Sequence, residues 1–126
     1  MIAGIGTDIV SIARIERAMG RHEGRFTEKV LAPAEQSVFA SIAKKAAYVA
    51  KRFAAKEAFF KAFGQPPGEA NTWHQLAIMN DGAGRPQMQF GAPLASLVRA
   101  QGIARWHVSL SDEHEFAIAY VILEKE

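Results

Sequence analysis

Asp8 stands in a sequence context that suits the binding of a charged ligand. It lies near the end of an alternating apolar segment, on the face that it shares with Gly4 and Gly6. Two glycines on one face leave room for a ligand or for another backbone to approach closely. Asp8 can therefore serve such a ligand, or the glycines can serve a bend and Asp8 can simply begin a turn.

Glu57 is the only acid in the long helical segment 44–63. Its neighbours three and four residues away along a helix are Phe53, Ala54, Phe60 and Lys61. A carboxylate on such an apolar stripe is costly to bury unless it is paired or coordinated. It could pair with Lys61, or it could bind a metal beside a phosphate-binding lysine. Proteins usually hold Mg²⁺ with one or two carboxylates plus substrate phosphates, so Asp8 and Glu57 would suit that ion if the fold brought them together.

Further polar side chains have two possible roles each. Positive charge follows the long helical segment at Lys44, Lys45, Lys51, Arg52 and Lys56. These side chains could bind phosphates or keep a helix soluble. A polar strand face carries His107, Ser109 and Ser111, which could donate to a phosphate or relay a proton, or could satisfy local hydrogen bonds.

Length and composition indicate one globular domain over residues 1–126. The 126 residues are 49% hydrophobic and 22% charged, and the absence of cysteine excludes disulfides, thiolate zinc sites and a cysteine nucleophile. The sequence has no membrane-spanning apolar run and no secretory signal, so we expect a cytoplasmic protein without a membrane partner. It also lacks a phosphate-binding Gly-Lys-Ser/Thr loop, a dinucleotide fingerprint and an aromatic platform for nucleic acid.

Charge is unevenly distributed along the chain. Residues 1–64 hold 11 Lys and Arg against 6 Asp and Glu, a formal charge of +5. Residues 65–126 hold 4 against 7, a charge of −3. The basic half indicates either an anionic ligand or partner, or a set of solvated helix faces.

The hydrophobic pattern predicts an α+β fold. It favours helices over about 12–22, 33–41 and 44–63 and a short one opened by Pro93, and strands over 2–10, 74–79, 86–90, 105–111 and 115–124. Ser11 can cap the first of these helices, and Gly64 ends the long one. Asp81-Gly82-Ala83-Gly84 is a hairpin signal. The order β-α-α-α-β-β-α-β-β predicts a single domain with a mainly antiparallel sheet and a long helix.

Three segments, in order, resemble the signatures of the 4′-phosphopantetheinyl transferase family. They are residues 4–10 (GIGTDIV), residues 52–62 (RFAAKEAFFKA) and residues 107–111 (HVSLS) with the strand through Tyr120. Gly84-Arg85-Pro86 also resembles the short Gly-Lys/Arg-Pro element of this family. The separation of the segments suits the short form of the family, and the similarity runs over about residues 2–124.

The resemblance implies an Mg²⁺-dependent transferase of fatty acid biosynthesis. Members move the phosphopantetheine arm of coenzyme A onto a serine of apo-acyl-carrier protein and release adenosine 3′,5′-bisphosphate. By position, Asp8 and Glu57 would be the magnesium ligands, and Lys61 would stand near the scissile pyrophosphate. These three residues would form the catalytic set.

The resemblance also implies binding residues and an assembly. Coenzyme A would contact Arg52, Lys61, Pro86, His107 and Ser109. The acidic carrier protein would contact Arg14 and Arg21 on the first helix, and Arg25, for which the family varies in spacing. The short form implies a homotrimer with active sites between subunits. Two other classes stay open: a non-catalytic module that binds an acidic protein or nucleic acid, and a metal-dependent phosphohydrolase.

Overall fold

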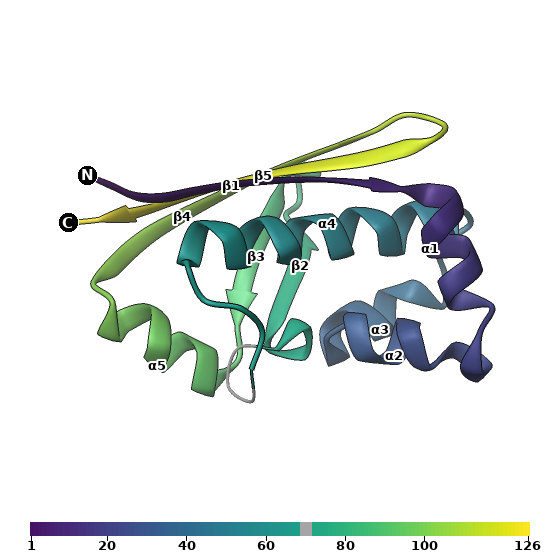
Figure 1. Cartoon of the computed structure of the whole chain (residues 1–126), viewed down its shortest axis with the longest axis horizontal. Helices are drawn as coiled ribbons and strands as arrows, with labels where there is room; N and C mark the ends of the chain where they lie inside the picture. Colours follow the sequence, from purple (N-terminus) through teal and green to yellow (C-terminus); the bar gives the residue numbers. More distant parts are fainter. Residues whose placement is uncertain (69–71) are drawn as a thin grey trace.

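The computed structural model of the protein describes residues 1–68 and 72–126. Its main sheet has three antiparallel strands in the order β1-β5-β4, formed by β1 (Ile2–Ser11), β5 (Phe116–Lys125) and β4 (Ile103–Asp112). The long helix α4 (Lys45–Phe63) runs along one face of this sheet (Figure 1). Because β5 is central, β1 and β4 form the two edges of the sheet.

Helix α4 packs unusually close to β1 at the two glycines. A Cβ atom at Gly6 would lie 1.8 Å from the carbonyl oxygen of Ala58, and one at Gly4 would lie 1.9 Å from that of Ala62. The glycines therefore allow another backbone to come close. The sequence had left open whether a ligand or a backbone would do so. The same strand face continues to Asp8, so this packing brings Asp8 against α4.

A separate hairpin lies beside β4. Its strands are β2 (Leu76–Asn80) and β3 (Pro86–Phe90), with the 3₁₀ helix η2 (Trp73–Gln75) before them. Asp81 shapes the turn, because its Oδ1 accepts hydrogen bonds from the backbone N–H groups of Ala83 and Arg85 at 2.8 and 2.9 Å. Helix α5 (Ala92–Ala100) then leads back to β4.

The remaining helices lie beside the N-terminal end of α4 (Figure 1). Helix α1 (Ile12–Met19) begins at its N-cap Ser11, as expected, but ends at the C-cap Gly20. The predicted helix over 12–22 was therefore too long, because Gly20 is a poor helix former. The 3₁₀ helix η1 (His22–Gly24) follows, then α2 (Arg25–Val30), which was not predicted, and α3 (Pro33–Phe39).

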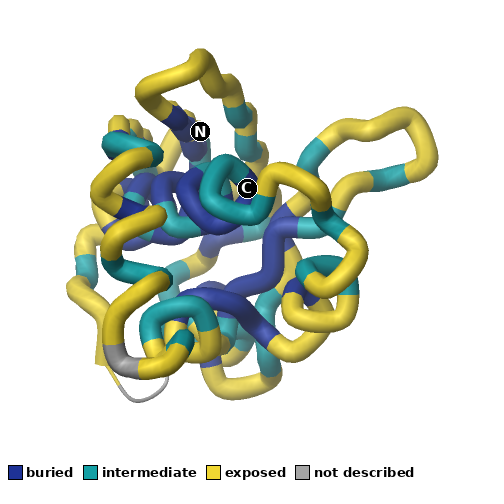
Figure 2. The backbone as a smooth tube through the Cα atoms, turned by 90° about the vertical axis from the view of Figure 1, so that its right-hand side faces the viewer, coloured by how far each residue is buried: buried dark blue, intermediate teal, exposed yellow. Residues whose placement is uncertain are grey.

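The core lies between α4 and the inner face of the main sheet, and Figure 2 shows the buried backbone concentrated at the centre. The outer face of the sheet is open. It presents large apolar side chains that are between 43% and 62% exposed: Ile5, Ile9, Phe116, Ile118 and Tyr120. The α+β class and the predicted element order are confirmed, with α2 as an addition. In the described part of the chain, no helix combines the length and apolarity needed to cross a bilayer.

Candidate active site

Asp8 and Glu57 meet in one pocket. The pocket has a volume of about 270 Å³ and lies between β1, α1 and α4. Arg14 of α1 lines it as well, and Phe26 and Phe53, with ring centroids 5.7 Å apart, form an aromatic part of its wall. Two segments 49 positions apart in the sequence thus bring their carboxylates to the same cavity, because the glycine face of β1 packs on α4.

Lys61 pairs with Asp8. Its Nζ lies 3.1 Å from Asp8 Oδ1 and donates a second hydrogen bond to the carbonyl oxygen of Thr7 at 2.9 Å. The lysine side chain is 58% exposed, whereas that of Asp8 is 18% exposed. The sequence suggested an ion pair between Lys61 and Glu57, but among the described residues Lys61 pairs with Asp8 instead. Lys61 is therefore held beside Asp8, which lines the carboxylate pocket, and still faces solvent.

Glu57 has a partner that its helical neighbours could not reveal. The indole Nε1 of Trp73 donates a hydrogen bond to Glu57 Oε2 at 3.1 Å. The Trp73 ring also packs against Phe53, with centroids 5.5 Å apart. Trp73 follows Glu57 by 16 positions and belongs to a different element. No sequence periodicity connects the two residues, so only the fold identifies this contact.

Lys56, next to Glu57 in the chain, is fully buried. Its Nζ donates to the Glu35 carboxylate and to the carbonyl oxygens of Val30 and Trp73. Desolvation by burial lowers the pKa of Lys56 to about 8, against the opposing effect of Glu35. Both suggestions for Lys56, phosphate binding and helix solubility, were wrong, because its counter-ion lies 21 residues away on α3.

The residues of the pocket fit a hard divalent cation. Asp8 and Glu57 supply carboxylate oxygens, which Mg²⁺ prefers, and Lys61 adds a positive charge for a phosphate. No group of three or more His, Asp or Glu side chains that could hold a metal ion exists among residues 1–68 and 72–126. A cation here would therefore draw only two ligands from this pair and would need substrate oxygens or water for the rest.

Three of the predicted coenzyme A residues share a second groove. Pro86, His107 and Ser109 line a cavity of about 590 Å³ between the hairpin and β4, together with Arg85. His107 Nε2 lies 2.7 Å from Glu124 Oε2. This hydrogen bond, supported by Arg105, lowers the pKa of the Glu124 carboxyl. His107 thus satisfies a local hydrogen bond while it borders an open, polar groove.

Arg52 borders a third cavity, of about 350 Å³, together with Lys44 and Lys51. Its guanidinium carbon lies 4.1 Å from the centroid of the Tyr48 ring, a cation–π geometry. The buried Nε atom of Arg52 has no hydrogen-bond partner within the described part of the chain. The hairpin residue Asn80 also lines this cavity, so Arg52 faces the hairpin, whereas Glu57 of the same helix faces β1.

The three predicted carrier-protein residues are all exposed. Arg14 is on α1 and reaches the carboxylate pocket. Arg21 was predicted on the same helix, but it lies beyond the end of α1. Arg25 begins α2 and lines a shallow depression with Lys29 and His74. The three arginines are therefore surface residues of the stretch 14–25, and Arg14 also borders the carboxylate pocket.

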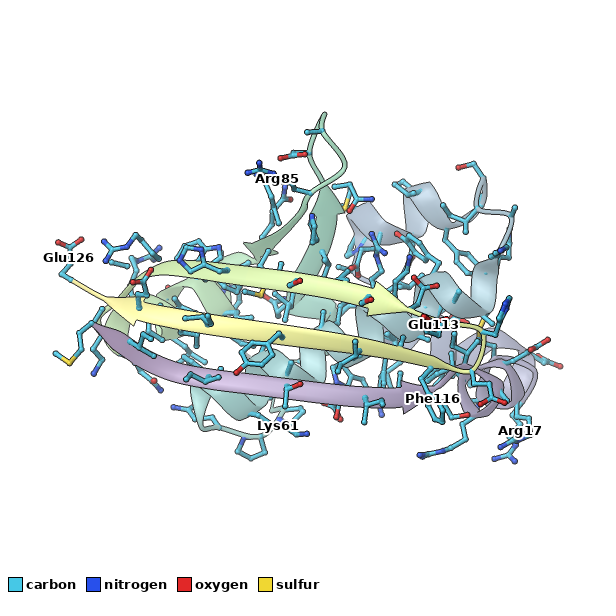
Figure 3. All side chains as sticks on the ribbon, turned by 90° about the horizontal axis from the view of Figure 1, so that it is seen from above. Arg17, Lys61, Arg85, Glu113, Phe116 and Glu126 are labelled. Carbon is cyan, nitrogen blue, oxygen red and sulfur yellow. The ribbon has the colours of Figure 1, made fainter. Side chains whose placement is uncertain are left out.

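The two sets of candidate residues lie at opposite edges of the main sheet. Lys61 contacts β1, whereas the second groove borders β4. Figure 3 shows Lys61 beside β1 and Arg85 beyond β4, with β5 between them. A single copy of the chain therefore does not bring the residues of the carboxylate pocket together with those of the groove beside β4.

The chain matches proteins of known name over almost its whole length. The profile of the 4′-phosphopantetheinyl transferase superfamily matches residues 4–121. A holo-[acyl-carrier-protein] synthase of Halorhodospira halophila is 46% identical, with 98% of each chain covered. The crystal structure of the synthase of that name from Neisseria meningitidis superposes with a TM-score of 0.96 at 42% identity, covering 99% of this chain and all of the other.

A further similar structure was solved as a complex with a ligand. It is a holo-(acyl-carrier-protein) synthase from Bacillus anthracis in complex with CoA (3′,5′-ADP). The match has a TM-score of 0.84 at 33% identity and covers 100% of this chain and 99% of that one. On these similarities in sequence and in fold, the chain belongs to the 4′-phosphopantetheinyl transferase superfamily and to the holo-[acyl-carrier-protein] synthases within it.

Proposed function

We propose that this protein acts in the cytoplasm and transfers the 4′-phosphopantetheine group of coenzyme A to a serine of apo-acyl-carrier protein, which prepares the carrier for fatty acid biosynthesis. The observation that carries this proposal is the shared pocket of Asp8 and Glu57, with Lys61 paired to Asp8. The names of the relatives and the coenzyme A complex of one of them support it. The domain that performs the reaction would span residues 1–126.

The catalytic set would consist of Asp8, Glu57 and Lys61. The two carboxylates would hold Mg²⁺, which, when bound, neutralises negative charge on the phosphates. The serine oxygen would form a bond to the β-phosphorus of coenzyme A as the bond to the leaving adenosine bisphosphate breaks in line, and the serine proton would pass to a carboxylate through a water molecule. Lys61, exposed and fixed by Asp8 and Thr7, would stabilise the charge that develops on the leaving group.

Coenzyme A would bind to Pro86, His107 and Ser109 in the β4 groove and to the buried Arg52. The unpartnered Nε of Arg52 and the neighbouring Lys44 and Lys51 support a phosphate contact there. Because these residues lie across the sheet from Lys61, the β1 edge of one copy and the β4 edge of another would complete one site. The open apolar face of the main sheet supports association between copies, since exposed patches of this kind mark interaction surfaces, and the family resemblance implies that the assembly is a homotrimer.

The acidic carrier protein would dock on Arg14, Arg21 and Arg25. Arg14 lines the carboxylate pocket, so a carrier bound to this stretch would have its serine near the reacting phosphate. Arg14→Glu and Arg21→Glu should raise the KM for the carrier about tenfold or more and leave coenzyme A binding little changed. Salt should weaken the wild-type encounter because the contacts are exposed. A carrier KM that is insensitive to both changes would contradict this docking surface.

One assay tests the proposed reaction. The protein is incubated with coenzyme A, Mg²⁺ and apo-acyl-carrier protein, and the carrier is weighed by mass spectrometry. A phosphopantetheine mass gain supports the transferase. Cleavage of coenzyme A without that gain would indicate a phosphohydrolase, and binding without reaction would indicate a non-catalytic module.

Two substitutions test the metal assignment in the same assay. Asp8→Ala and Glu57→Ala should abolish the mass gain without unfolding the protein. Glu113→Gln is the control, because it removes an acid in the turn between β4 and β5, away from the pocket. This variant should react normally. Near-normal turnover by either alanine variant in Mg²⁺ would overturn the assignment.

A further inference from the structure

Trp73 connects the carboxylate pocket to the buried interior. Its indole N–H donates to Glu57 Oε2 at 3.1 Å, and its ring packs on Phe53, which lines the pocket. Lys29 Nζ lies over the same ring, 5.4 Å from its centroid. The indole is therefore held by an aromatic neighbour and a cation while its one polar atom is directed to Glu57.

The backbone of Trp73 is fixed by the residue next to Glu57. Lys56 Nζ donates to the carbonyl oxygen of Trp73 at 3.1 Å. Adjacent residues of α4 thus hold Trp73 at two points, Lys56 at the main chain and Glu57 at the indole. This double attachment ties η2 to the part of α4 that faces β1.

Lys56 can hold the Trp73 carbonyl in place because its own charge is paired with a buried counter-ion. Its counter-ion Glu35 is also fully buried and accepts backbone hydrogen bonds from Ala32 and Ile78, both at 2.8 Å. A buried ion pair with such complete hydrogen bonding has one favourable arrangement, since any displacement leaves a charge or an amide unpaired. The Trp73 carbonyl therefore rests on a rigid support.

We propose that Trp73 is a positioning residue of the Asp8–Glu57 site. By holding one oxygen of Glu57, its indole N–H fixes the rotamer of the carboxylate before a cation arrives, so that less ordering remains to be done on binding. Hydrogen-bonded supports of metal ligands commonly contribute 10–100-fold in metal affinity. This inference rests on the proposed role of Glu57 in holding Mg²⁺ and adds the residue that orients it.

The first test removes the N–H and keeps an aromatic ring. Trp73→Phe should weaken the binding of Mn²⁺, used as a spectroscopic substitute for Mg²⁺, by about 10–100-fold in electron paramagnetic resonance titrations. The Mg²⁺ concentration for half-maximal activity should rise by a similar factor, with a smaller fall in kcat at saturating Mg²⁺. The unfolding temperature should stay close to that of the wild type. Lost metal affinity without lost stability would distinguish a positioning role of the indole N–H from a purely structural one.

The other tryptophan supplies a matched control. Trp106 also donates its indole N–H, but to the carbonyl oxygen of Met88 at 3.0 Å, away from the carboxylate pocket. Trp106→Phe should bind Mn²⁺ as the wild type does. The sequence has two tryptophans, so this variant also leaves Trp73 as the only indole fluorophore. Mg²⁺ should then change its emission, whereas Trp73→Phe, which reports from Trp106, should show no such change.

The outcomes separate this inference from the proposed reaction. Unchanged Mn²⁺ affinity in folded Trp73→Phe would overturn the role of Trp73. If that variant does not fold, a Trp106→Phe emission that stays constant at saturating Mg²⁺ would overturn it instead. Both measurements are made without carrier protein. If the wild-type protein fails to load the carrier, the proposed transferase activity is refuted, but the metal-binding results still test the role of Trp73.

Discussion

Lys61 combines an ion pair with an exposed charge, and one substitution can separate the two. Lys61→Ala removes a pair whose lysine is 58% exposed. Exposed pairs contribute at most about 1 kcal/mol, so the free energy of unfolding should change by less than that. The transfer rate should fall about 10²–10³-fold, because a charge at the leaving group would be lost.

Urea denaturation and the carrier mass assay measure the two effects on the same sample. Lys125→Ala, an exposed lysine at the end of β5, is the control and should leave both quantities unchanged. A Lys61→Ala protein that is as active as the wild type would remove Lys61 from the catalytic set.

At the scale of elements, the contact between β1 and α4 builds the pocket. Gly6→Ala would place a Cβ 1.8 Å from the Ala58 carbonyl oxygen, a backbone atom that cannot move aside alone. The strand would have to separate from the helix, and we expect a loss of about 1–3 kcal/mol in stability together with a strong loss of activity. Thermal unfolding and the mass assay test this, and Gly82→Ala in the hairpin turn, where no atom lies within 4 Å, should be tolerated.

The Lys56–Glu35 pair joins α4 to α3. Lys56→Met would leave the Glu35 carboxylate buried without its counter-ion and should lower the free energy of unfolding by about 3–5 kcal/mol. Lys51, on the same helix as Lys56, forms a partly exposed pair with Asp112 at the end of β4, and Lys51→Met should cost less than about 1 kcal/mol. Urea denaturation measures both, and equal small losses would contradict the structural role of the buried pair.

The sequence predicted elements better than contacts between them. The strand alternation, Ser11 as a cap, Gly64 as a stop and the Asp81 turn are local signals, and each describes the structure correctly. The partners of Lys56 and Glu57 were not predictable, because Glu35 and Trp73 lie on other elements and share no period with α4. That Asp8 and Glu57 share a pocket depends on the glycine contact, which sequence allowed but could not distinguish from a ligand site.

At the scale of the whole molecule, the distance between the two edges of the main sheet yields a mixing experiment. Asp8→Ala disables the β1 side and His107→Ala the β4 side, so each protein alone should be inactive or nearly so. Mixed and reassembled in equal amounts, the two should recover about a quarter of wild-type activity, the statistical share of sites with two intact halves in a closed ring.

The comparison that matters is with each variant mixed with itself, which should recover nothing. Absence of recovery in mixtures whose subunits have exchanged would show that a site is not shared between copies. Sedimentation of the wild type as a monomer at working concentration would contradict the trimer directly.

The exposed isoleucine, phenylalanine and tyrosine side chains on the outer sheet face have a consequence for kinetics. If copies must meet through this face before any site is complete, the rate per protein molecule depends on how much protein is present. Dilution below the dissociation constant of the assembly would then inactivate the enzyme without any inhibitor. The progress curve would begin with a lag, and the lag would shorten as the enzyme stock is concentrated. The abundance of the chain would itself set the threshold for carrier loading.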